Sequence, residues 1–126
     1  MKVYLLINAA LYAVFALWCT LKATNTATNL GYVELNNSGR SEYLVIYGGL
    51  QGGLAVLFFL LARDAAYHKL GIMVSIGVYA PIVLYRLATI WKFSPVSSLT
   101  LSVCALETGL LIAAVWLAVR SEAFGR

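Results

Sequence analysis

The chain has 126 residues, of which 62% are hydrophobic and only 11% are charged, and its formal net charge is +4. A soluble domain carries about 25% charged residues and buries only part of its surface at this size, so the composition excludes an ordinary soluble domain. The positive residues are scattered singly at the ends of apolar runs, which is typical of membrane-flanking positions and excludes a nucleic-acid-binding surface.

Four apolar runs follow one another along the chain, at residues 3–21, 43–62, 70–90 and 99–119. Each matches the roughly 20 residues that a helix needs to cross a bilayer. The links between them contain Asn, Ser, Gly, Pro and most of the charges, as links in water should. We therefore predict an all-α integral membrane four-helix bundle, formed as a single domain over residues 1–126 and embedded in the lipid bilayer.

The first run begins after Lys2, like a signal peptide, but it is long for a signal core. Its exit lacks a clean small-x-small cleavage site, so we expect it to remain as the first span. The link that follows, residues 22–42, is the longest of the three. It could cover the outer mouth of the bundle through Tyr32 and Glu34, or it could be a mobile connection, because length alone does not decide between these.

The distribution of positive charge indicates the orientation in the membrane. With four spans, the N-terminus, the second link and the C-terminus share one side. That side holds Lys2, Arg63, Lys69, Arg120 and Arg126, whereas the opposite side holds Lys22, Arg40 and Lys92. This bias favours both termini in the cytoplasm. We expect the protein in the bacterial inner (cytoplasmic) membrane.

The second run contains YGGLQGGL at residues 47–54. A phosphate-binding loop would follow a strand and bring a Lys and a Ser or Thr, which this stretch lacks. Its glycines instead form two overlapping GxxxG patterns, one made by Gly48 and Gly52 and the other by Gly49 and Gly53. Small residues four apart let another helix approach closely, so we interpret all four as helix-packing residues, within the chain or in a homodimer.

Two charges lie inside predicted spans, Arg86 in the third and Glu107 in the fourth. Because these spans form a hairpin, the two residues lie at similar depths and an arginine can reach the glutamate. Tyr47 and Gln51 enter the membrane from the same side. We therefore predict a polar pocket in the outer half of the bundle, built from these four residues. Three roles stay open for the charged pair: structural pairing, binding of a ligand or solute, and proton handling.

The sequence offers no metal or cofactor site. Cys19 and Cys104 have no metal-ligand spacing, and His68 is the single histidine, so we expect neither a metal nor a cofactor. A disulfide between the two cysteines is conceivable, although small apolar packing residues are the simpler interpretation. Glu107 could donate a proton, but no other residue completes a catalytic set. The sequence therefore does not exclude enzymatic activity, and it does not favour it.

The segment RSEYLVIYGGL, residues 40–50, resembles a family of short bacterial four-span membrane proteins of unknown function. Members of that family show an Arg-x-Glu pair before a Tyr-Gly-Gly helix, an arginine late in the third span and a glutamate in the fourth. The matching residues here are Arg40, Glu42, Tyr47, Gly48, Gly49, Arg86 and Glu107. The resemblance implies a four-helix inner-membrane protein and supplies no reaction.

The four predicted spans and the predicted polar pocket are compatible with two functions from different classes. The first is an accessory or structural membrane subunit with a polar Arg–Glu core, whose partner would be another membrane protein or a second copy of the chain. The alternative is a binding or transport protein that holds a small solute, a quinone or a lipid head group in the predicted outer pocket.

Overall fold

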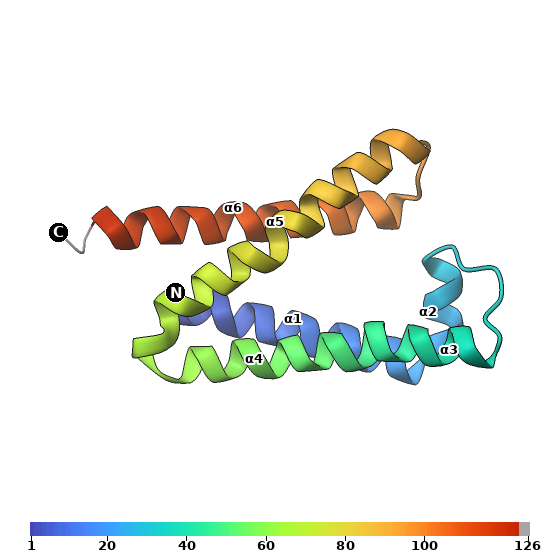
Figure 1. Cartoon of the computed structure of the whole chain (residues 1–126), viewed down its shortest axis with the longest axis horizontal. Coiled ribbons are helices and arrows are strands. Elements are labelled where there is room, and N and C mark those ends of the chain that lie inside the picture. Colours follow the sequence, from blue (N-terminus) through green and yellow to red (C-terminus); the bar gives the residue numbers. More distant parts are fainter. Residues whose placement is uncertain (124–126) are drawn as a thin grey trace. The chain divides into compact units, whose positions relative to one another are not determined.

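The structure, a computed structural model, describes residues 1–123 and is shown in Figure 1. It is 88% helical and has no strand within that range, which confirms the all-α class. Four helical stretches are long and apolar enough to cross a membrane, which agrees with a multi-pass membrane protein. Arg126, one of the charges that we use to predict the orientation, lies outside the described residues.

The long helices cover all four predicted spans and extend beyond most of their ends. The elements in chain order are α1 (Lys2–Leu21), α2 (Ala23–Asn29), α3 (Asn37–Leu44), a π-helical segment (Val45–Leu50), α4 (Gln51–Arg63), a 3-10 turn (Ala65–Tyr67), α5 (His68–Phe93) and α6 (Ser98–Ala123). They form two compact units. The N-terminal unit is Lys2–Ala65, and the C-terminal unit begins at Ala66.

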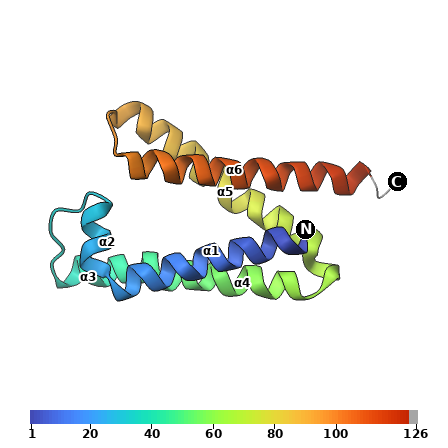
Figure 2. The ribbon, with the colours of Figure 1, turned by 180° about the vertical axis from the view of Figure 1, so that it is seen from behind.

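In the N-terminal unit, α1 and α4 lie side by side and run antiparallel, as both views show (Figures 1 and 2). Leu5 of α1 and Phe58 of α4 are fully buried. The ring of Tyr12 stacks on that of Phe58, with 5.7 Å between the ring centroids. Apolar residues recurring every three or four positions along each helix therefore give this unit its core.

Helix α3, the π-helical segment and α4 form one continuous stretch, Asn37–Arg63, and Asn36 sets its start. The Oδ1 atom of Asn36 accepts a hydrogen bond from the backbone N–H of Gly39 at 2.8 Å. Such a cap satisfies one of the amides that the first helical turn leaves unbonded. The span therefore begins several residues before the apolar run at 43–62 that predicts it.

The first link is largely helical, because it contains α2 and the start of α3. Helix α2 ends at Asn29, and Gly31, two residues later, has a φ of 94°, in the left-handed region that favours glycine. The N–H of Tyr32 then bonds to the carbonyl oxygen of Ala27 at 3.0 Å and closes the turn. The structure thus gives this link helical segments, and both predictions for it, a cover of the outer mouth and a mobile connection, stay predictions.

In the C-terminal unit, α5 and α6 form a hairpin whose turn lies at residues 94–97. Helix α6 is covered least: within residues 98–121, only Ala114 is buried. Large apolar side chains such as Ile112 and Trp116 are more than half exposed on it. An apolar helix with so little protein cover suits a lipid environment.

Candidate functional site

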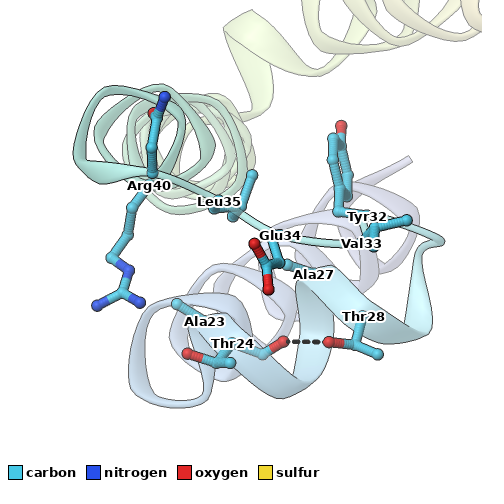
Figure 3. A pocket seen from close by; sticks show the side chains of 10 residues that line it. Ala23, Thr24, Ala27, Thr28, Tyr32, Val33, Glu34, Leu35 and Arg40 are labelled. Atoms are coloured by element: carbon cyan, nitrogen blue, oxygen red, sulfur yellow. Dashed lines mark hydrogen bonds between the residues drawn. The ribbon is translucent and has the colours of Figure 1, made fainter.

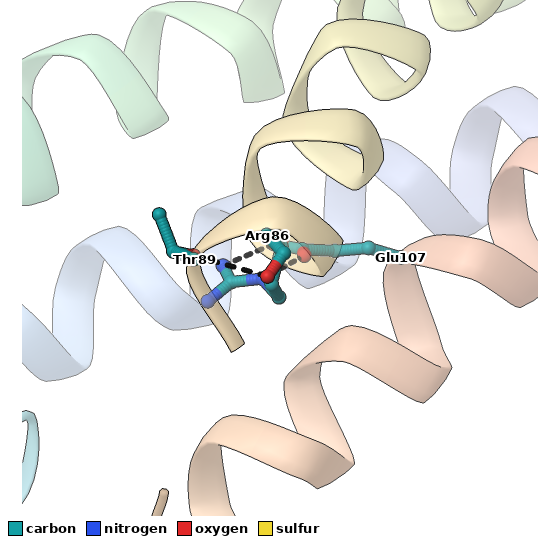
Figure 4. Close-up of polar contacts among 3 residues, drawn as sticks. All are labelled: Arg86, Thr89 and Glu107. Carbon is teal, nitrogen blue, oxygen red and sulfur yellow. Dashed lines mark hydrogen bonds and ion pairs between the residues drawn. The ribbon is translucent and has the colours of Figure 1, made fainter. Parts of the chain in front are cut away.

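The two charged residues of the hairpin form a direct ion pair, drawn in Figure 4. Nη2 of Arg86 donates to Oε1 of Glu107 at 2.7 Å, and Nε of Arg86 donates to Oε2. The side chains are 29% and 16% exposed, respectively. The pairing that the hairpin geometry predicts is therefore present, and it is bidentate.

The positions of the two residues along their helices explain the contact. Arg86 lies seven residues before the end of α5, and Glu107 lies nine residues after the start of α6. At about 1.5 Å per residue, their distances from the turn differ by only about 3 Å, which a long arginine side chain spans. Charge-assisted bidentate bonds are among the strongest in proteins and fix the relative orientation of both groups.

The structure places Tyr47 in a cluster of aromatic rings within the N-terminal unit. Its ring stacks on that of Tyr43, with centroids 4.6 Å apart, and lies 6.4 Å from the ring of Phe15. Its hydroxyl oxygen lies 3.4 Å from that of Tyr32. This cluster is an arrangement that sequence reasoning missed, because it depends on how the first link folds.

Gln51 is half-buried and begins α4 directly after the π-helical segment. The structure thus shows two groupings, Tyr47 with the other tyrosines and Arg86 with Glu107. The pocket predicted from all four residues would combine residues of both units, and it stays a prediction.

The four glycines of the second span have different surroundings. A Cβ atom added at Gly48 would lie 2.6 Å from Oγ1 of Thr20, so α1 approaches the backbone closely there. A Cβ atom at Gly49, Gly52 or Gly53 would meet no atom within 4 Å in the described structure. Close packing inside the chain is therefore shown for Gly48, and for the other three a packing role stays a prediction.

A pocket of about 360 Å³ lies beside α2, where the sequence predicts only a link (Figure 3). We call it the cap pocket. It is lined by one face of α2, the loop that follows and the first turn of α3: Ala23, Thr24, Ala27, Thr28, Tyr32, Val33, Glu34, Leu35, Asn36 and Arg40. The sequence signal for it was the possibility that Tyr32 and Glu34 cover the outer end of the bundle.

The cap pocket contains two opposite charges, Glu34 and Arg40. Figure 3 shows both side chains extending toward α2. Within residues 1–123, neither side chain takes part in an ion pair or a hydrogen bond. These charges contrast with Arg86 and Glu107, which neutralise one another.

The remaining groups that could carry metal or redox chemistry are few. Cys19 and Cys104 are free thiols, Cys19 buried and Cys104 half-buried. Across the described part of the chain, no three His, Cys, Asp or Glu side chains come together as potential metal ligands.

Comparisons with protein-family models, with curated proteins and with solved structures give no match. The resemblance of residues 40–50 to a family of bacterial four-span proteins therefore stays a prediction, and the functional argument rests on geometry.

Proposed function

We propose that this chain is a small multi-pass protein of the bacterial inner membrane, with both termini in the cytoplasm. In this proposal it acts as an accessory or structural subunit and carries no reaction of its own. The observation that carries the proposal is the bidentate pair of Arg86 and Glu107, in which each charge neutralises the other.

Proton transfer to a substrate would need one of the carboxylate oxygens of Glu107, and both are bonded to Arg86. The same pair is costly to break in an apolar medium, since one charge would be left without its partner. The geometry at Arg86 and Glu107 therefore favours a register-setting role over catalysis.

The exposed glycines of the helical stretch Asn37–Arg63 suit an accessory subunit. Gly49 and Gly53 are both exposed and lie four residues apart on one face of a membrane-spanning helix. Such a pattern lets the backbone of another helix come close. The proposed partner on that face is another membrane protein. The alternative occupant of the same face is a second copy of this chain.

The alternative is a binding or transport protein that holds a small solute, a quinone or a lipid head group among Tyr47, Gln51, Arg86 and Glu107. It has weaker support, because Glu107 already uses both carboxylate oxygens on Arg86. The hydroxyl of Tyr47 also lies beside that of Tyr32.

Native mass spectrometry of the tagged protein in mild detergent tests the accessory role. We expect a second membrane protein to remain bound to the wild-type chain and to be lost from Gly53→Leu, with the melting temperature unchanged because the site is open. Gly77→Leu is the matched control, because a Cβ atom at Gly77 also meets no atom within 4 Å. A wild-type chain that never carries another protein or a second copy would overturn the accessory role.

A further inference from the structure

The cap pocket has the size and mixed chemistry of a small-molecule site. Its volume of about 360 Å³ falls within the roughly 300–1,000 Å³ of known ligand pockets. Ala27, Val33 and Leu35 supply apolar surface, and threonine and asparagine side chains supply hydrogen-bonding groups around it. None of these residues belongs to the pair of Arg86 and Glu107, so the pocket is independent of the proposed accessory role.

The charges of the pocket define the ligand that would fit. Arg40 and Glu34 are its only charged side chains, and their signs are opposite. A guanidinium matches the geometry of a phosphate or carboxylate, which it binds through two parallel hydrogen bonds. A carboxylate such as that of Glu34 is suited to an ammonium group. Since the two side chains are not bonded to each other, both remain accessible to one ligand that carries both charges.

Glu34 and Arg40 lie on different walls of the pocket. Tyr32 lines the pocket, and its ring is held edge-on against that of Tyr43, with centroids 5.8 Å apart. Tyr32 and Glu34 are also close in sequence, on the loop after α2, whereas Arg40 belongs to α3. The cation-binding Glu34 therefore comes from one wall of the pocket and the anion-binding Arg40 from another.

The walls are preformed. Thr26 is buried, and its hydroxyl hydrogen-bonds to the carbonyl oxygens of Lys22 and Ala23 at 2.9 and 3.1 Å. The same oxygen accepts a hydrogen bond from the hydroxyl of Tyr43 at 2.8 Å. Thus α2 is fixed to α3, the helix that carries Arg40. A preorganised site loses less conformational entropy when a ligand binds.

We propose that the cap pocket binds a small zwitterion that carries an ammonium group and a phosphate or carboxylate group. Arg40 binds the anionic group, and Glu34 binds the ammonium. The apolar lining covers the short carbon chain between them. This chemistry is shared by the ethanolamine-phosphate headgroup of a phospholipid and by a free solute such as phosphoethanolamine.

The test uses the full-length protein in nanodiscs made only of phosphatidylglycerol, whose headgroup lacks an ammonium. Free phosphoethanolamine is titrated in one arm, and phosphatidylethanolamine is included in the nanodisc in the other. The readout is the rise in melting temperature followed by tryptophan fluorescence, because a ligand that binds only the folded state stabilises it. Stabilisation in the first arm indicates a free solute as the source, and stabilisation in the second arm alone indicates a lipid.

Three variants assign the effect to the pocket. Glu34→Gln and Arg40→Gln should each weaken binding about tenfold or more, which corresponds to a lost charge-assisted contact of about 1.4 kcal/mol. Glu42→Gln is the matched control, since it removes an exposed carboxylate of α3 that does not line the pocket, and it should bind like the wild type. All three positions are exposed, so the variants should fold.

Two single-charge probes make the proposal falsifiable on the wild-type protein alone. Glycerol phosphate lacks the ammonium and ethanolamine lacks the phosphate. Each should therefore need at least a tenfold higher concentration than phosphoethanolamine to give the same rise in melting temperature. Equal effects of the zwitterion and either probe would overturn the proposal. So would the absence of stabilisation in both arms, or stabilisation that survives both pocket variants.

Discussion

At the scale of single residues, the ion pair of Arg86 and Glu107 should behave as a unit. Removing either partner alone leaves a charge in an apolar region, so Arg86→Ala and Glu107→Ala should each destabilise the protein by about 3–5 kcal/mol. The double variant should cost less than the sum of the two, with a coupling energy of about 0.5–3 kcal/mol. Unfolding of all four proteins in detergent measures this cycle. Strictly additive effects would contradict the structural role.

Gly48 makes a second prediction at the same scale. A methyl group there would collide with the hydroxyl of Thr20, so Gly48→Ala should destabilise the protein by about 1–3 kcal/mol. Combining it with Thr20→Ala, which removes the colliding hydroxyl and keeps a good helix former in α1, should restore most of the loss. Gly49→Ala is the control, because its position is open and alanine favours the helical state, so the free energy of unfolding should stay the same or rise. Equal destabilisation by both single variants would refute the close approach of α1.

At the scale of elements, α2 depends on its contacts with the rest of the N-terminal unit. Its sequence, ATNTATN, has five polar residues of low helix propensity, and its only apolar residues are Ala23 and Ala27. Buried contacts among Cys19, Ala27 and Tyr43 hold it in place. This is why the sequence predicts a link there, and why the aromatic cluster and the cap pocket could not be inferred in detail. By contrast, the pair of Arg86 and Glu107 was predictable because both residues belong to one hairpin, where depth follows from counting residues.

The anchoring of α2 can be tested through the hydroxyl of Tyr43. Tyr43→Phe removes the buried hydrogen bond to Thr26 and should destabilise the attachment of α2 to α3 by about 1 kcal/mol. Hydrogen exchange should then become faster in α2 and the loop after it, with little change in α4, because local openings depend on local contacts. Tyr85→Phe is the control, as Tyr85 is 76% exposed and should have no effect. An unchanged rate of hydrogen exchange in α2 would show that this hydrogen bond does not hold α2 against α3.

At the scale of the whole molecule, composition and run length were sufficient to predict four long apolar helices. The apolar runs at 3–21 and 99–119 fall inside helices Lys2–Leu21 and Ser98–Ala123. Length and hydropathy determine such elements because a bilayer-crossing segment must satisfy its own backbone hydrogen bonds. The packing inside each unit, such as the stacking of Tyr12 on Phe58, depends on individual side chains, for which apolar runs carry no signal.

The orientation in the membrane is the prediction at this largest scale. Four spans place the first and third links on one side, and the positive-charge bias places that side outside the cytoplasm. In a variant in which Cys19 and Cys104 are replaced by alanine, single cysteines at Ser38 and Ala66 report the two sides, since both positions are exposed. An impermeant maleimide added to intact spheroplasts should label Ser38→Cys at once and Ala66→Cys only after the membrane is permeabilised.

The reverse labelling pattern would place the termini and the second link outside, and the charge argument would fail. Labelling of both cysteines in intact spheroplasts would mean that the two positions share a side, which four spans do not allow. The expected pattern has one further consequence. It places the cap pocket on the outer face of the membrane, because Ser38 lies between two residues that line it, Asn36 and Arg40. Its zwitterion would then come from outside the cytoplasm or from the outer leaflet.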